Sequence, residues 1–67
     1  MSDNDRFYDD VDTLLDEWFA RGEFSGMTPQ RTVAWLLMGE YPHLTEDGAR
    51  ALVRVWFDCA RDMGEID

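Results

Sequence analysis

Two stretches of the chain space their apolar residues as the buried face of an amphipathic helix does, and a third stretch between them is apolar nearly all round. In the first stretch, the apolar residues with this spacing are Phe7, Val11, Leu14, Leu15 and Trp18. In the last stretch they are Ala49, Leu52, Val53, Trp56, Cys59, Ala60 and Met63. No segment alternates apolar and polar residues as a half-buried strand would. The pattern predicts an all-α, compact three-helix domain with helices over about 5–21, 28–38 and 45–63, forming a single domain over 1–67.

Helix boundaries are predicted from residues with special backbone preferences. Thr28 and Pro29 fit the N-cap and first position of the second helix, and Thr45 fits the N-cap of the third. Gly39 and Gly64 are expected just after the last residues of these two helices. Between the first two helices we expect a loop over 22–27, with room for one short extra helix.

The second helix has too few polar residues for an ordinary exposed face. Val33, Leu36 and Leu37 share one side of it, whereas Trp35 and Met38 point elsewhere. This helix is therefore either central to the core or partly a docking surface, and we expect Trp35 and Met38 to contact a partner.

Several large apolar residues lie beside the predicted buried stripes rather than on them. These are Tyr8, Phe19, Tyr41, Val55 and Phe57. A domain of 67 residues has room to bury only some of them. They either wrap around the small core or remain exposed as anchors for a partner protein, and Phe57 is the predicted contact among them.

The net charge of −9 is concentrated at the two ends of the sequence. Residues 1–17 carry −6, residues 18–57 are neutral and residues 58–67 carry −3, and the chain has no lysine. Binding to nucleic acid or to an anionic membrane requires cations, so neither is expected. A partner with a basic surface is favoured instead.

The acidic residues of the first helix are predicted to form a strip. Asp5, Asp9, Asp12 and Asp16 fall on one side, and Glu17 falls on a neighbouring side with Asp10. Like charges four residues apart destabilise a helix, so stability alone does not favour this arrangement. The strip is either a solvated face that keeps the protein soluble or a surface that binds a partner. Its carboxylates are about 6 Å apart along the axis, which is comparable to the spacing of successive phosphates.

The sequence contains no motif for catalysis or metal binding. Cys59 and His43 are the only cysteine and histidine, too few for a zinc site. The acidic N-terminal residues fail the spacing of a calcium-binding loop. We therefore expect no enzyme activity, no cofactor and no metal. Cys59 is predicted to be a core residue in a reducing, cytoplasmic compartment, since no signal peptide or apolar run of about 20 residues is present.

The third helix carries arginines on its predicted outer side, at Arg50, Arg54 and Arg61. Acids that can pair with them locally are Asp47, Asp58 and Asp62. These charges form either a ladder of weak intrahelical ion pairs or a polar patch that orients a partner.

In size, acidity and excess of aromatic residues, the chain resembles small acidic phage-encoded inhibitors, including anti-CRISPR proteins and DNA mimics. The resemblance rests on "DNDRFYDDVDTLLDE" and "DCARDMGEID". It implies a viral inhibitor that binds a host nucleic-acid-handling protein stoichiometrically and without catalysis. Carboxylates that would contact its basic groups are Asp9, Asp12, Asp16 and Glu17. The arginines of the third helix depart from this pattern.

A different class of protein is also compatible with the sequence. A helical adaptor, or a dimeric regulatory module, would bind a partner helix through the apolar face of the second helix. The sequence leaves open whether the chain is a monomer or a homodimer.

Overall fold

A computed structural model describes residues 3–65, with side chains from Arg6 onward. Within this range the chain forms three helices, α1 (Asp3–Ala20), α2 (Gln30–Glu40) and α3 (Glu46–Asp62), and no strand. The all-α three-helix prediction is therefore confirmed. The Cα radius of gyration is 11.4 Å, close to the value of about 11 Å expected for a compact domain of this length.

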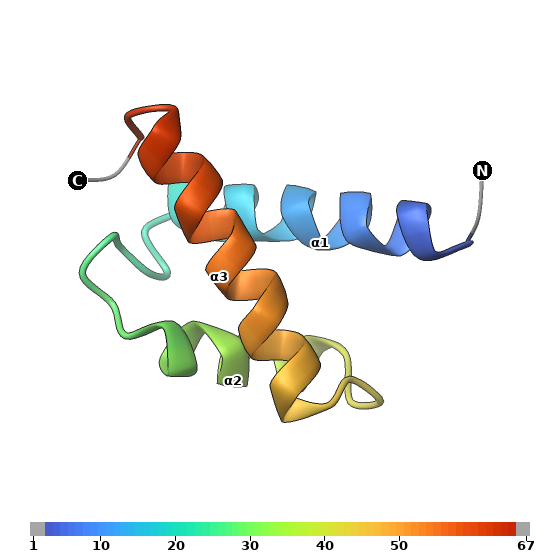
Figure 1. Ribbon diagram of the computed structural model, residues 1–67. Coiled ribbons are helices and arrows are strands. Elements are labelled where there is room, and N and C mark those ends of the chain that lie inside the picture. Colours follow the sequence, from blue (N-terminus) through green and yellow to red (C-terminus); the bar gives the residue numbers. More distant parts are fainter. Residues whose placement is uncertain (1–2, 66–67) are drawn as a thin grey trace.

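The α3 helix is the centre of the arrangement. It packs against α2, which lies beside the first half of α3, and crosses α1 at a steep angle (Figure 1). The half of α1 nearest the N-terminus extends away from this crossing. Both ends of α3 therefore extend beyond its crossing with α1 (Figure 1).

The core consists of apolar side chains from all three helices and from the first loop. Its buried members are Val11, Leu15, Trp18, Phe24, Val33, Ala34, Leu37, Ala49, Val53, Trp56, Phe57 and Ala60. No polar side chain is buried among the described residues. The predicted stripes of α1 and α3 thus supply most of the core.

The loop between α1 and α2 adds a residue that the helix pattern did not include. It contains turns and no extra helix, and it includes Gly22, whose φ of 80° favours glycine. The loop folds Phe24 back onto α3, where the ring contacts Trp56 and Phe57 at centroid distances of 5.4 and 5.7 Å. Phe57 is 2% exposed as a result, so its predicted role as a partner contact is wrong.

Helix ends agree with the sequence at α3 and differ at α2. Thr45 caps α3 by accepting a hydrogen bond from the Gly48 backbone N–H at 3.1 Å. At the start of α2, Thr28 instead accepts a hydrogen bond from the Ser25 backbone N–H, so Pro29 is the N-cap residue and α2 begins without a side-chain cap. The helix continues through Gly39 to Glu40, and the predicted end at Gly39 is wrong.

Three predictions of burial fail at the edges of the fold. Leu36, which was predicted to share a side of α2 with Val33 and Leu37, is 44% exposed, whereas Val33, Ala34 and Leu37 are the buried residues of α2. Cys59 and Met63, on the predicted buried stripe of α3, are exposed at its C-terminal end. No helix in the described part of the chain is long and apolar enough to cross a bilayer.

Candidate functional site

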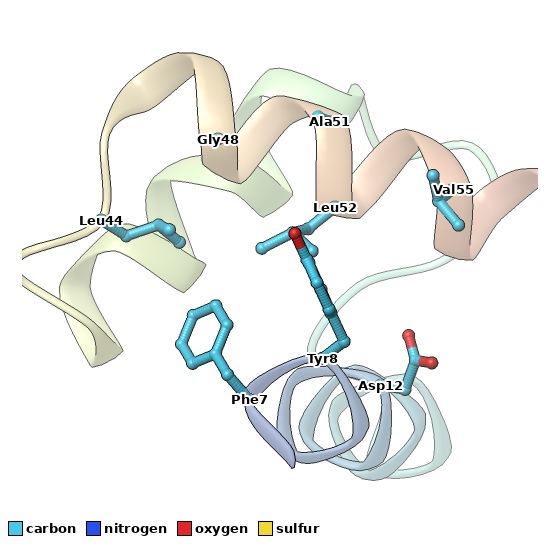
Figure 2. A pocket seen from close by; sticks show the side chains of 8 residues that line it. All are labelled: Phe7, Tyr8, Asp12, Leu44, Gly48, Ala51, Leu52 and Val55. Atoms are coloured by element: carbon cyan, nitrogen blue, oxygen red, sulfur yellow. The ribbon is translucent and has the colours of Figure 1, made fainter. Parts of the chain in front are cut away.

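A groove with a volume of about 510 Å³ lies between the first half of α1 and the first half of α3. Figure 2 shows Phe7, Tyr8 and Asp12 of α1 facing Leu52 and Val55 of α3 across it. The remaining lining residues are Leu44, Gly48 and Ala51. The lining is mostly apolar, and Asp12 is its only charged residue.

The apolar lining is accessible to a partner. Tyr8 is 52% exposed and Val55 is 58% exposed, although both are large apolar residues. Phe7 is half-buried and packs edge-on against Tyr41 at a centroid distance of 5.3 Å. Large apolar side chains left exposed side by side are characteristic of interaction surfaces.

A smaller hollow of about 180 Å³ adjoins the groove, and the two share Asp12 and Val55. Its other lining residues are Asp16, Trp56, Cys59, Met63 and Glu65. Together the groove and this hollow follow the line where α3 passes over α1. We refer to the pair as the α1–α3 groove.

Three carboxylates of α1 form one wall of the α1–α3 groove or lie beside it. The pKa of Asp12 is raised above its usual value of 3.8, first by burial and then by the negative charges of Asp16 and Asp9. These carboxylates are therefore close enough to repel one another, as the predicted strip requires. The repulsion is present in the free protein and would be relieved by a bound cation.

Asp16 has a second role in the fold. Its Oδ1 accepts a hydrogen bond of 2.8 Å from Nε1 of Trp56, which joins α1 to α3. Buried tryptophan N–H groups usually need such a partner. This bond holds Asp16 in place at the edge of the groove.

The other predicted contact residues are not all part of this site. Asp5 lies in α1, but its side chain falls outside the described residues. Glu17 is exposed and lies about 140° around the helix from Asp12, so it faces away from the groove. Trp35 is 65% exposed on α2, Met38 is half-buried against the core, and neither lines the groove.

Sequence reasoning identified the acids of this site and the excess apolar residues, but it did not bring them together. It also missed the hydrogen bond between Asp16 and Trp56. A tryptophan on a predicted buried stripe was the available signal, because its N–H needs an acceptor that an apolar core does not supply.

No group of three His, Cys, Asp or Glu side chains is placed to hold a metal ion within the described part of the chain. The His43 ring lies beside Phe7 and Tyr41, in an aromatic cluster at the turn before α3. Comparisons with protein-family models, curated proteins and solved structures give no match.

Proposed function

We propose that this protein is a non-catalytic binding protein that uses the α1–α3 groove to bind a basic surface of another protein. The observation that carries the proposal is the repulsion among Asp9, Asp12 and Asp16 beside an exposed apolar surface. A lysine or arginine of a partner would relieve this repulsion, and apolar residues beside it would cover Tyr8 and Val55.

The partner we propose is a protein that binds nucleic acid. Basic protein surfaces commonly bind nucleic acid, and carboxylates spaced about 6 Å apart along a helix resemble a row of phosphates. The protein would then act as an inhibitor of a host nucleic-acid-binding complex, in the manner of anti-CRISPR proteins and other phage-encoded DNA mimics. Its place of action would be the cytoplasm of the host cell.

A second candidate function rests on a different surface. Trp35 and Leu36 are 65% and 44% exposed on α2, and they offer an apolar contact without charge. An adaptor or a homodimer that used this surface would bind in high salt, because apolar contacts are not screened.

The experiment compares salt dependence and charge reversal. The tagged protein is incubated with bacterial lysate at low and high salt, and captured proteins are then tested for loss of nucleic-acid binding. The variant Asp9→Lys with Asp12→Lys reverses the charge at two positions of the acidic groove wall. Glu23→Lys with Glu40→Lys is the matched control, since it changes the net charge equally at exposed positions that do not line the groove.

If the protein is such an inhibitor, we expect it to capture a nucleic-acid-binding protein and to release it in high salt. The captured protein should also lose its nucleic acid when this protein is added. The groove variant should fail to capture it, whereas the control variant should succeed. Capture that survives high salt and the groove variant, but not Trp35→Ala, would favour the adaptor. A doubled mass in light scattering that Trp35→Ala abolishes would favour the homodimer.

A further inference from the structure

Half of the chain's six cations line a single hollow, which lies between the start of α2 and the middle of α3. Arg31 comes from α2, Arg50 and Arg54 lie one turn apart on α3, and Gln30 and Ala51 complete the lining. The volume is about 440 Å³, and all three arginines are exposed. Such a concentration of positive charge is unexpected in a chain of net charge −9.

Ion pairing within the protein does not account for these arginines. Arg50 pairs with Glu46 at 3.2 Å, and both side chains are about half exposed. Among the described residues, Arg31 and Arg54 have no carboxylate within 4.0 Å. The predicted pairs with Asp47, Asp58 and Asp62 do not form there, and the one ion pair on α3 uses Glu46 instead. The three guanidinium groups that line the hollow and the one carboxylate paired with them sum to a charge of about +2, with Asp47 and Asp58 one helical turn away on α3.

The start of α2 adds to the positive potential of the hollow. Pro29 is its N-cap residue and supplies no side-chain hydrogen bond, and the first turn contains no acidic residue. In contrast, α3 begins with Thr45 as a cap, followed by Glu46 and Asp47. Gln30 and Arg31, which line the hollow, are thus at an uncompensated helix N-terminus with a partial charge of about +0.5.

We propose that this hollow binds a phosphate group carried by a small molecule. The planar fork of arginine donates two parallel hydrogen bonds to phosphate oxygens. A phosphate dianion matches the local charge of the hollow, whereas a carboxylate neutralises only half of it. A long nucleic acid would also meet the acidic surface that makes up most of the chain's charge, so a small phosphorylated molecule is favoured over a polynucleotide.

The size of the hollow leaves room for more than one phosphate group. No aromatic side chain lines it, so a nucleobase would have no ring to stack on. Recognition would therefore depend on the phosphate groups themselves, and pyrophosphate is a suitable probe.

The test is a titration with pyrophosphate at constant ionic strength. Binding is monitored by the shifts of the backbone amide signals in NMR spectra. We expect saturable shifts at Gln30, Arg31 and the α3 turn from Arg50 to Arg54. Arg54→Gln should weaken binding at least fivefold, and Arg54→Lys should weaken it less, because it keeps the charge but loses the fork. Arg61→Gln is the matched control on the same helix, outside the hollow, and should bind as the unaltered protein does.

Several results would overturn the proposal. Amide shifts that do not saturate would mean that pyrophosphate is attracted to the protein non-specifically by charge. Shifts that decrease by the same amount in Arg54→Gln and in Arg61→Gln would mean the same. Succinate binding as tightly as pyrophosphate would remove the preference for phosphate. A short single-stranded oligonucleotide that binds more tightly per phosphate than pyrophosphate would exclude a small molecule as the natural source of the group.

Discussion

Asp16 on α1 and Trp56 on α3 are joined by a hydrogen bond of 2.8 Å, although 40 positions separate them in the sequence. The bond uses a carboxylate of the acidic wall to hold the two helices that form the α1–α3 groove. The same side chain thus contributes to the fold and to the charge of the candidate site. Substitutions that separate these two roles are the most informative ones.

Asp16→Ala removes the acceptor and leaves the Trp56 N–H without its partner. Loss of a hydrogen bond to a charged group should lower the free energy of unfolding by about 1–3 kcal/mol. Asp16→Asn keeps an acceptor oxygen and should cost less than half as much. Urea unfolding followed by tryptophan fluorescence measures both values, and equal losses in the two variants would show that the charge, not the bond, stabilises the fold.

Asp12→Asn tests the repulsion along the acidic wall. The folded state holds the Asp12 proton to a higher pH than the unfolded chain does, because burial and neighbouring charges raise the pKa. Stability from this residue is therefore present below its usual pKa of 3.8 and is lost as the pH rises through the raised value.

Thermal melts from acidic to neutral pH provide the measurement for Asp12. The difference in Tm between Asp12→Asn and the unaltered protein should shift in favour of the variant as the pH rises through this window. A difference that does not vary with pH would mean that the carboxylate is not perturbed by folding. Glu46→Gln is a suitable control for Asp12→Asn. It also removes one negative charge, but from a carboxylate on α3 that pairs with Arg50 and is not part of the acidic wall.

Phe57→Ala should lower stability far more than Trp35→Ala does. Phe57 is 2% exposed, and its removal should cost about 3–5 kcal/mol through lost burial and the cavity that remains. Trp35 is 65% exposed, and its removal should change the free energy of unfolding by less than about 0.5 kcal/mol. Chemical denaturation of both variants checks the pair, and a large loss for Trp35→Ala would place its ring in the core.

Thr45→Ala removes the only side-chain cap observed at a helix start of α2 or α3. The Gly48 N–H would lose its acceptor, so the variant should be less stable by about 1 kcal/mol. Thr45→Ser preserves the hydroxyl and should recover most of the loss. Denaturation midpoints of the two variants provide the comparison, and an equal loss in both would mean that the hydroxyl is not the stabilising group.

The sequence was sufficient for the number and approximate positions of the helices, because these depend on local spacing and on caps such as Thr45. It was insufficient where distant segments meet. The exposure of Phe57 was wrongly predicted because Phe24 belongs to a loop, and helical spacing assigns loop residues no face. Cys59 lies on the predicted buried stripe of α3 but is exposed, because spacing does not show how closely a neighbouring helix packs against each turn.

The candidate site was predictable only in part for the same reason. The carboxylates of α1 share one side of a single helix, so their proximity follows from sequence. The groove requires the crossing angle of α1 and α3, which local patterns do not encode. Similarly, Arg50 and Arg54 could be placed together on α3, but the approach of Arg31 from α2 required the tertiary structure.

The two halves of α1 are held unequally, and this affects how the protein would meet a partner. Val11, Leu15 and Trp18 anchor α1 in the core from its middle onward, whereas the turns before Val11 are held mainly by Phe7, which is only half-buried against the core and Tyr41. Opening of the first turns should therefore cost much less free energy than global unfolding, and their amide hydrogens should exchange first. The acidic wall extends across this boundary, from Asp9 to Asp16. A partner that binds the whole wall would slow exchange in the first half of α1, so part of its binding energy would go into ordering the helix.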